Sequence, residues 1–296
     1  MDAATRDAAR RLDDALRSIA RGIAVAVSGG IDSLTLATAA HAARGDVEMF
    51  HAVSAAVPGD ATARVERLAA ERGWRLRVVE AGEFEDVDYV ANPTNRCFFC
   101  KTNLYGTIGR HTAAQMVSGA NTDDLGEFRP GLDAARNSAV RHPYLEAGID
   151  KRTVRALARG LGLGDLSELP AAPCLSSRVE TGIAIRPEVL RAIHAVERDL
   201  AGDFPRGTVR CRVRAAGVVL ELDPATLGAL DADRRAALER DVRRRFGALL
   251  PDASLTFSPY RNGSAFLQGF SAAGASAAGF SAAGFSAAGA SKEHSH

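Results

Sequence analysis

Residues 23–33 read IAVAVSGGIDS, in which an apolar run from Ile23 to Val27 leads directly into a glycine-rich loop. Five consecutive apolar residues are typical of a buried strand in a parallel sheet, because such a strand is covered on both faces. The next stretch, LTLATAAHAA at 34–43, has the composition of a helix. A strand, a tight loop and a helix in this order predict the first unit of an α/β fold.

The same alternation of strand and helix patterns continues to about residue 172. Strand-like runs lie at 47–55, 75–80 and 115–121, and helical patterns lie at 62–73 and 151–163. An amphipathic helix precedes the first strand, with one apolar face formed by Ala9, Leu12, Leu16 and Ile19. We therefore predict a doubly wound parallel sheet over residues 1–172, with ligands bound at the carboxyl ends of its strands.

From Pro173 onwards the pattern changes. A helical pattern at 187–200 precedes an alternating stretch at 207–223, and the alternation predicts a hairpin. A long helical pattern at 225–246 and a strand-like run at 254–257 follow. These patterns predict a smaller C-terminal α+β domain over 173–266. Pentads such as FSAAG fill 270–289. Ala, Gly and Ser cannot bury enough surface to offset the entropy of ordering, so we predict a flexible tail over 267–296.

Composition and charge disfavour several classes of protein. The 296 residues include 37 basic and 36 acidic ones, a balance that gives no electrostatic basis for binding long nucleic acids. The sequence contains no run of about 18 apolar residues, so it predicts no membrane span. The N-terminal stretch alternates charges and lacks the apolar segment of a secretory signal. We expect a cytoplasmic protein with reduced thiols, no nucleic-acid or membrane partner, and a homo-oligomeric state.

Residues 28–33 have the chemistry of a phosphate-binding loop. Gly29 and Gly30 allow the backbone to approach a phosphate, and successive N–H groups at a helix N-terminus attract an anion. Ser28 and Ser33 add hydroxyl donors. Asp32 is unfavourable beside phosphates unless a cation intervenes, so it predicts Mg²⁺. The alternative is a glycine-rich turn that caps a helix.

The hexapeptide SGGIDS after an apolar run resembles the PP-loop of the N-type ATP pyrophosphatases. The resemblance implies a PP-loop ATP pyrophosphatase domain that cleaves ATP between the α and β phosphates and leaves AMP on the substrate. Members use either ammonia or sulfur as the second reactant, and no glutaminase domain precedes this loop. Further strand ends offer nucleotide contacts at Ser54 and within GANTDD, 119–124, which contains Asn121 and Asp124. An ordinary Asx turn is the alternative for that stretch.

The four cysteines fall into two groups. Cys211 alternates with arginines in VRCRV, which places it on the opposite strand face and predicts a core residue. Cys97 and Cys100 form a CxxC, and Cys174 is far away in sequence. A structural disulfide is disfavoured in a reducing cytosol. A zinc site requires four ligands, and the sequence offers only these three thiols and no well-spaced histidine. Inert thiols, a three-cysteine iron–sulfur site with one open iron and a single reactive thiol at Cys174 remain open.

Six stretches together resemble the LarE-type ATP-dependent sulfur transferases over about residues 10–265. They are SGGIDS, NPTNRCFFCK at 92–101, RPGL at 129–132, PAAPCLSSR at 170–178, VRCR at 209–212 and PYRNGS at 259–264. That family acts in the biosynthesis of the nickel-pincer nucleotide cofactor of lactate racemase. The resemblance implies an enzyme that adenylates a carboxylate of a pyridinium dicarboxylate mononucleotide and converts it to a thiocarboxylate, with 173–266 as the substrate and sulfur-transfer domain.

The resemblance also assigns roles to the cysteines. Some members have one cysteine at the position of Cys174 and sacrifice its sulfur, which leaves dehydroalanine. Others carry three, and the presence of Cys97 and Cys100 predicts that this chain is of the type that binds a [4Fe–4S] cluster. We expect Lys101 to neutralise charge during catalysis, with a solvated helix residue as the alternative. Arg129, in RPGL, is expected to contact the nucleotide.

Other residues match the substrate and metal positions of the family. Those expected to hold the substrate phosphate or carboxylate are Ser177, Arg178, Arg210 and Arg212, with a solvated basic strand as the alternative. Glu197 and Glu221 match acidic residues of a metal site, whose third partner aligns only loosely with Asp231. A tRNA-thiolating enzyme, an ammonia-using synthetase and a non-catalytic nucleotide-binding protein are the rival interpretations.

Overall fold

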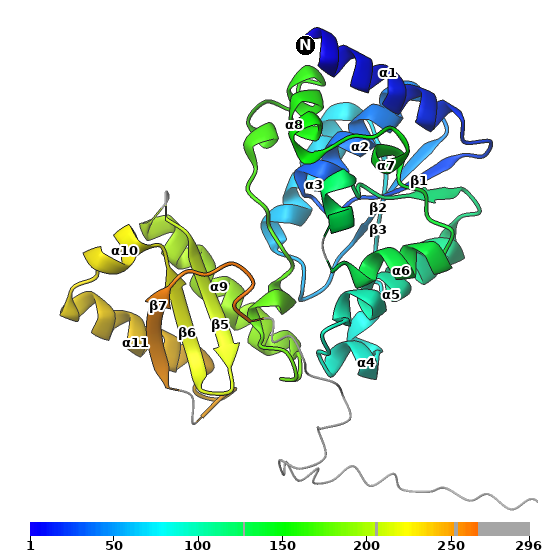
Figure 1. The fold of residues 1–296 in the computed structure, drawn as a ribbon. Coiled ribbons are helices and arrows are strands. Elements are labelled where there is room, and N and C mark those ends of the chain that lie inside the picture. Colours follow the sequence, from blue (N-terminus) through cyan, green and yellow to red (C-terminus); the bar gives the residue numbers. More distant parts are fainter. Residues whose placement is uncertain (127, 205–206, 252–253, 266–296) are drawn as a thin grey trace, which may run out of the picture.

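The protein is described by a computed structural model that covers residues 1–126, 128–204, 207–251 and 254–265 (Figure 1). Its larger sheet has four parallel strands, β1 (Ile23–Ala26), β2 (Val47–Ala52), β3 (Arg75–Val79) and β4 (Gln115–Val117). Their order is β3-β2-β1-β4. The chain adds β2 and β3 on one side of β1 and then returns to add β4 on the other side. The predicted parallel α/β sheet is confirmed. The predicted tail, 267–296, lies outside the described residues.

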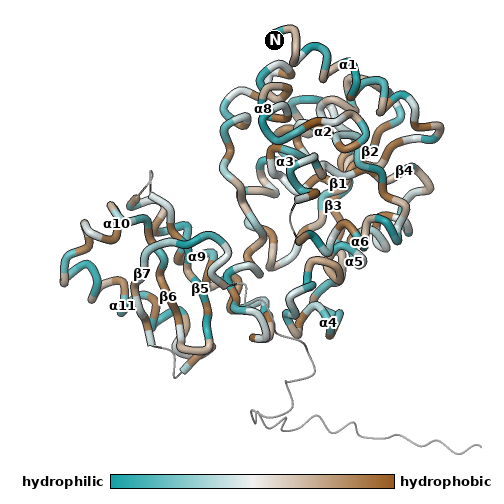
Figure 2. Tube along the Cα trace, in the orientation of Figure 1, coloured by the Kyte–Doolittle hydropathy of each residue, from teal (hydrophilic) through white to brown (hydrophobic). Residues whose placement is uncertain are grey.

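Helices cover both faces of this sheet, as a doubly wound fold requires. One face packs on α1 (Ala3–Arg17), α2 (Ile31–Ala43), α3 (Gly59–Arg72) and α8 (Lys151–Gly160). The other face packs on α5 (Arg96–His111) and α6 (Pro130–Asn137). Short helices complete this part, namely α4 (Val87–Val90), α7 (Pro143–Glu146) and the 3₁₀ turns at Glu83–Glu85, Thr122–Gly126 and Gly164–Glu168. Figure 2 shows mixed teal and brown along α1, as expected of a helix with one buried face.

The smaller sheet is built as the alternating stretch predicts. Strands β5 (Val209–Arg214) and β6 (Gly217–Leu222) form an antiparallel hairpin, and β7 (Leu255–Pro259) pairs parallel to β6. Between β6 and β7 the chain forms α10 (Pro224–Ala229) and α11 (Ala232–Phe246), while α9 (Pro187–Asp203) precedes the hairpin. Residues Val196, Leu220 and Phe246 are buried in its core.

One helix prediction is wrong in this region. The pattern at 225–246 predicts a single helix, but the chain breaks between α10 and α11. Asp231 lies at the break with an extended backbone and accepts a hydrogen bond from the Arg234 N–H at 2.7 Å, so it caps α11. An N-cap aspartate competes with helix continuation, because its carboxylate satisfies an N–H group that the preceding turn would otherwise bind.

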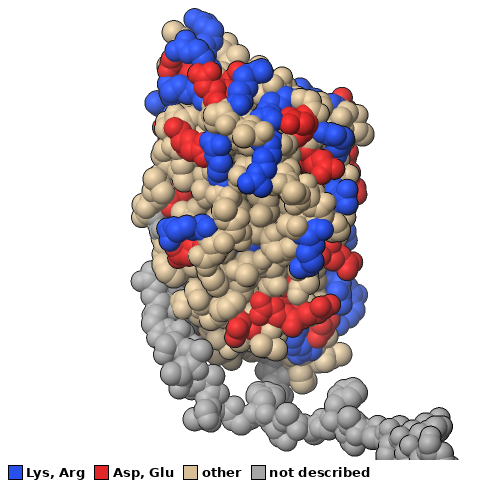
Figure 3. All heavy atoms as spheres, turned by 90° about the vertical axis from the view of Figure 1, so that its right-hand side faces the viewer, with Lys and Arg blue, Asp and Glu red and all other residues tan. Residues whose placement is uncertain are grey.

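The described helices and the surface charge can be compared with the hydropathy and charge of the chain. No helix in the described ranges is long and apolar enough to cross a membrane. On the face drawn in Figure 3, acidic and basic side chains lie beside one another near the top and along the right-hand side, an acidic group lies near the bottom, and much of the middle is uncharged.

The core of the smaller sheet depends on Phe246, whose side chain is 1% exposed. We expect Phe246→Ala to lower the free energy of unfolding by about 3–5 kcal/mol, because it removes a buried ring and leaves a cavity. Urea unfolding followed by circular dichroism measures the change. The control is Val87→Ala, since Val87 is 78% exposed. Equal stability of the two variants would contradict the assigned core.

Candidate active site

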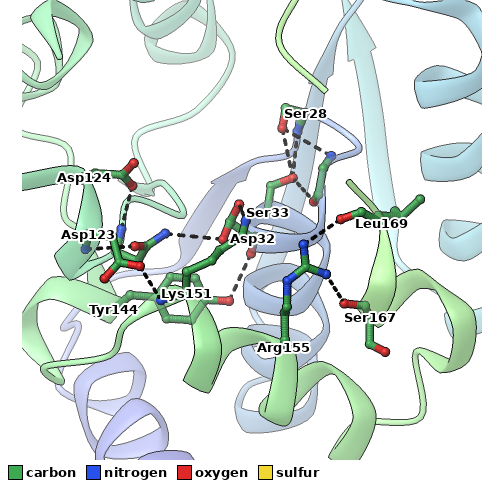
Figure 4. Close-up of polar contacts among 12 residues, drawn as sticks. Ser28, Asp32, Ser33, Asp123, Asp124, Tyr144, Lys151, Arg155, Ser167 and Leu169 are labelled. Carbon is green, nitrogen blue, oxygen red and sulfur yellow. Dashed lines mark hydrogen bonds and ion pairs between the residues drawn. The ribbon is translucent and has the colours of Figure 1, made fainter. Parts of the chain in front are cut away.

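The glycine-rich loop lies at the carboxyl end of β1, where Figure 4 shows its polar contacts. Gly29 has a φ of 81°, in the left-handed region, and a Cβ built on it would lie 2.8 Å from the carbonyl oxygen of Ala61. Only glycine therefore fits without movement of the loop or of α3. Gly30 is extended and precedes the first turn of α2. The loop thus has the close backbone turn expected at a phosphate-binding helix N-terminus.

The two serines brace this loop. The Ser33 hydroxyl accepts from the Ser28 N–H at 3.0 Å and donates to the Gly30 carbonyl at 3.0 Å, and it lies 3.1 Å from the Ser28 hydroxyl. From outside, the Arg64 guanidinium donates to the Gly29 carbonyl at 2.8 Å. The Ser28 side chain faces solvent and Ser33 is buried. Ser33 therefore holds the shape of the loop, while Ser28 lies at its surface.

Asp32, on the first turn of α2, is the centre of a polar network. Its carboxylate forms an ion pair with Lys151, at the start of α8, and accepts from the Asn121 side-chain amide at 3.4 Å. The Tyr144 hydroxyl donates to its carbonyl at 3.0 Å. Gly119 packs against the same turn, and a Cβ on it would lie 3.1 Å from the Asp32 carbonyl carbon. Three other stretches of the sequence thus meet at the phosphate loop.

Lys151 is a site residue that the sequence analysis missed. It follows Asp150, which caps α8 by accepting from the Thr153 N–H at 2.7 Å. The cap was visible as an aspartate before a helical pattern, but the partner of Lys151 is 119 residues earlier in the chain. Helical periodicity carries no information about such a pairing.

The stretch after β4 lies beside Asp32. The Asn121 N–H donates to Asp124 at 2.9 Å, and Arg129 forms an ion pair with the other Asp124 oxygen at 2.8 Å. The local geometry is therefore that of an Asx turn, and this turn lies next to the phosphate loop. Ser54 lies at the carboxyl end of β2, where its hydroxyl accepts from the Ala56 N–H at 3.2 Å.

Cys97, Cys100 and Cys174 come together, although Cys174 is far from the CxxC in sequence. Cys97 and Cys100 lie on the first turns of α5, and Cys174 immediately precedes the 3₁₀ turn Leu175–Arg178. Burial raises the pKa of the Cys100 thiol to about 12; the charge of Lys101 opposes this rise, and the charges of Cys174, Glu83 and Cys97 contribute to it. Burial, followed by the charge of Cys174, also raises the pKa of Cys97. The three thiols are therefore close enough to act on one another.

The thiol site borders the nucleotide side of the molecule. The Leu175 N–H donates to the Ala56 carbonyl at 2.9 Å, which places the Cys174 stretch at the carboxyl end of β2. Arg129, the partner of Asp124, lowers the pKa of Cys97 by its charge. Within the described ranges, no three His, Cys, Asp or Glu side chains are placed so that together they could hold a metal ion.

Lys101 faces the same thiols. Its ammonium lies over the Tyr105 ring, 5.9 Å from the centroid. Burial lowers the pKa of Lys101, but the charges of Tyr105 and the neighbouring thiols outweigh burial, so its pKa is raised. A Cβ on Gly131 would lie 3.2 Å from the Lys101 side chain, so the RPGL stretch packs tightly against it.

Cys211 is separate from these thiols, as predicted. Its side chain is fully buried in the core of the smaller sheet. Burial, together with the nearby charge of Glu197, raises its pKa well above the ordinary value.

The residues expected to bind the substrate anion are also close together. The Arg212 guanidinium donates to the Ser177 carbonyl at 3.1 Å, and Arg178 donates to the Ser177 hydroxyl at 3.0 Å. Arg210 lies over the Tyr260 ring, 5.8 Å from the centroid. Burial, and then the charge of Arg178, lowers the pKa of Arg210.

Two glutamates already neutralise part of this charge. Glu197 binds Arg178 through two contacts of 3.0 Å and accepts from the Cys211 N–H at 2.9 Å. Glu221 binds Arg212 at 2.6 Å and also binds Arg214 and Ser264. The predicted metal role of these glutamates would require displacement of their arginines, because both carboxylates are engaged. Asp231, the loosely aligned third partner, is used to cap α11.

The fold and the loop define an α/β protein with a phosphate-loop turn at the carboxyl edge of a parallel sheet. The chain is 30% identical to the pyridinium-3,5-bisthiocarboxylic acid mononucleotide synthase of Lactiplantibacillus plantarum over 222 residues, which are 72% of this chain and 79% of that protein. The chain therefore belongs to the family of this synthase, the LarE family, and by this homology it is an enzyme.

Two uncharacterized proteins are also similar. Protein slr1717 of Synechocystis is 35% identical over 180 residues, which are 58% of this chain and 66% of that protein. Protein MJ0830 of Methanocaldococcus jannaschii is 28% identical over 138 residues, which are 45% of this chain and 53% of that protein. No family model matches the chain.

The turn at Gly29 generates a prediction about stability. We expect Gly29→Ala to lower the free energy of unfolding by about 1–3 kcal/mol, because alanine is disfavoured at positive φ and its Cβ would meet Ala61. Thermal melting measures the effect. Gly59→Ala is the control, since a Cβ there meets nothing within 4 Å, and it should leave stability unchanged. A Gly29 variant as stable as this control would refute the close approach.

The charge of Lys101 generates a second prediction. Because that charge lowers the pKa of Cys97 and Cys100, Lys101→Met should reduce the thiolate fraction and slow their alkylation by iodoacetamide at pH 8. Peptide mass spectrometry of each cysteine gives the rates. Lys101→Arg should preserve them, and Lys151→Met is the control for loss of a lysine elsewhere. Equal rates in Lys101→Met and Lys101→Arg would contradict the assignment.

Proposed function

We propose that this enzyme is an ATP-dependent sulfur transferase that adenylates a substrate carboxylate and then replaces AMP with sulfur. The observation that carries the proposal is the gathering of Cys97, Cys100 and Cys174 at the edge of the sheet that also bears the phosphate loop. Adenylation requires the loop, and sulfur transfer requires a sulfur source next to it. The neighbouring location of the two chemistries supports a single two-step reaction.

The proposed substrate is a pyridinium dicarboxylate mononucleotide. The relative from L. plantarum is a synthase of pyridinium-3,5-bisthiocarboxylic acid mononucleotide, a product with two thiocarboxylates. A carboxylate becomes a thiocarboxylate if its oxygen is first activated as a leaving group, and AMP provides one. Arg210, Arg212, Arg178 and Ser177 would hold the substrate phosphate or the second carboxylate, since guanidinium groups form charge-assisted hydrogen bonds to such anions.

ATP would bind with its phosphates at the loop 28–33. The backbone N–H groups after Gly29 and the N-terminus of α2 would hold the phosphate oxygens. Asp32 has the carboxylate oxygens that Mg²⁺ prefers, and Lys151 is placed to neutralise negative charge on the phosphates or on Asp32 itself. Asn121, Asp124 and Ser54 would border the nucleotide, with Arg129 behind Asp124.

In the first step, the substrate carboxylate would attack the α-phosphorus and pyrophosphate would leave. The chain's contribution is position and charge: the loop fixes the phosphates, and Lys151 stabilises the charge that develops on the pyrophosphate. In the second step, a sulfur nucleophile would attack the acyl-adenylate carbonyl and AMP would leave. Lys101 lies beside the thiols and would stabilise negative charge on the sulfur.

The three thiols are donors of the kind that iron–sulfur clusters use. Three half-buried thiols act on one another, yet they do not surround one ion in the described part of the chain. A [4Fe–4S] cluster is bound through thiolates on different irons, so its ligands need not meet at a point. We propose that Cys97, Cys100 and Cys174 hold such a cluster, which would supply an iron open to an external sulfur ligand. The alternative is a sacrificial Cys174.

The adenylation step can be tested at Asp32. We expect Asp32→Asn to reduce ATP-dependent pyrophosphate release about a hundredfold or more, because it removes a charge that orders the phosphates and their cation. The measurement uses a coupled pyrophosphate assay on folded protein. Asp133→Asn, which changes an exposed aspartate on α6, is the control and should retain activity. Full activity in a folded Asp32 variant would overturn the nucleotide site.

The sulfur step can be tested with Cys97→Ala, Cys100→Ala and Cys174→Ala. We expect each variant to lose transfer of sulfur to the mononucleotide and to retain pyrophosphate release, because the loop does not depend on the thiols. Cys211→Ala is the control for sulfur transfer. Iron and sulfide analysis of anaerobically purified protein accompanies the assay.

Other outcomes discriminate between the alternatives. Loss of transfer in Cys174→Ala alone would support the sacrificial route. Retention of transfer in all three variants would overturn the sulfur-transfer function. Release of pyrophosphate that depends on ammonia or on tRNA, instead of the mononucleotide, would identify one of the rival classes.

A further inference from the structure

Asn92 occupies an unusual position between the two stretches that carry the thiols. Its side chain is completely buried, and its φ of 56° lies in the left-handed region, which asparagine tolerates better than most residues. It lies four residues before Arg96, where α5 begins, and follows α4 closely in the chain. A buried amide in a disfavoured backbone conformation needs compensating contacts.

The contacts of Asn92 join the CxxC helix to the chain that follows Cys174. Its side-chain N–H groups donate to the carbonyls of Glu180 and Ile183, each at 2.9 Å. Its side-chain oxygen accepts from Arg96, the residue before Cys97. Its backbone carbonyl accepts from the Gly182 N–H at 2.9 Å. The same residue therefore holds the start of α5 and the segment 180–183.

Two further contacts extend this connection, which we call the Asn92 seam, between residues 89–92 and 176–185. The Tyr89 hydroxyl lies 2.7 Å from the Ser176 hydroxyl, and the Ile185 N–H donates to the Val90 carbonyl at 2.9 Å. Tyr89 and Ser176 are both buried. The seam begins two residues after Cys174, so its contacts constrain where that thiol lies relative to Cys97 and Cys100.

We propose that Asn92 is a positioning residue that keeps Cys174 within reach of Cys97 and Cys100. It acts through the two chain segments that it joins, because its partners across the seam are backbone carbonyls and a backbone N–H, and its side-chain oxygen accepts from Arg96. The inference rests on the proposed function in one respect, namely that these thiols share a role in sulfur transfer. The spatial claim itself is independent of any reaction.

Phenylarsine oxide tests the spatial claim directly, because it condenses with two nearby thiols to give a dithioarsinite and water. The background is full-length Cys97→Ala, in which Cys100 and Cys174 are the pair that the seam holds together. We expect this protein to retain one arsenical, measured by intact-mass spectrometry under native conditions and by titration. Adding Cys174→Ala should abolish retention, which shows that Cys174 supplies one of the sulfurs.

In the same background, Asn92→Gly should weaken arsenical retention about tenfold or more, because Cys174 then spends most of its time out of reach of Cys100. Glycine adopts the positive φ without strain and removes only the side-chain contacts. Asn103→Ala is the matched control, because it removes the side-chain amide of a residue within α5, which donates to Asp86 and Phe99 outside the seam. It should retain the arsenical like the parent.

A second substitution guards against a variant that does not fold. If Asn92→Gly lacks a cooperative melting transition, Asn92→Asp takes its place, since it keeps the acceptor for Arg96 and loses both N–H donors. A folded Asn92 variant that retains the arsenical as tightly as the control overturns the proposal. A Cys97→Ala protein that retains none also overturns it, because Cys100 and Cys174 would then not be held together.

Activity separates this inference from the proposed function. In otherwise unaltered protein, we expect Asn92→Gly to retain pyrophosphate release and to lose sulfur transfer by a factor comparable to the loss of arsenical affinity. If the arsenical results are as expected while the unaltered protein transfers no sulfur, the positioning role stands and the proposed function fails. If sulfur transfer survives in Asn92→Gly despite weakened retention, the positioning role in catalysis is wrong and the proposed function stands.

Discussion

The backbone turn at Gly29 is the constraint on which the rest of the site depends. Its positive φ and its close approach to Ala61 allow the chain to pass from β1 to α2 through the short loop 27–30, so Asp32 lies on the first helical turn. Lys151, Asn121 and Tyr144 then meet at Asp32. The loops that supply these residues are held at one edge of the sheet, and the charge on the Asp32 carboxylate is balanced there.

Two buried ion pairs lie in and beside the smaller sheet. Arg178 with Glu197 and Arg212 with Glu221 are nearly excluded from water, and breaking such a pair leaves a buried charge at a large cost. An anionic substrate could share these guanidinium groups by adding hydrogen bonds, whereas a metal bound to the glutamates would have to replace them. The arrangement therefore favours anion binding over metal binding at this sheet.

Sequence patterns predicted the elements better than the contacts between them. The apolar run at 23–27, the alternation around Cys211 and the turn glycines act locally, so the strands, the hairpin and the loop could be read from the chain. The roles of Lys151 and Asn92 could not, because their partners lie far away in sequence. Lys151 begins a helical pattern, but that pattern does not identify its partner, and Asn92 belongs to no periodic pattern. The break at Asp231 was missed for the opposite reason: a local cap competed with a helical pattern that continued through it.

The environment of the CxxC bears on how its thiols can act. A thiol whose pKa is about 12, like that of Cys100, is protonated at neutral pH and is a poor nucleophile. Metal binding changes this balance, because the metal displaces the proton and stabilises the thiolate that burial disfavours. Lys101 already offers partial compensation from one side. A Cys100 thiol that burial keeps protonated is a poor choice for the attacking sulfur of the proposed reaction, which leaves Cys174 or a sulfur from outside the chain.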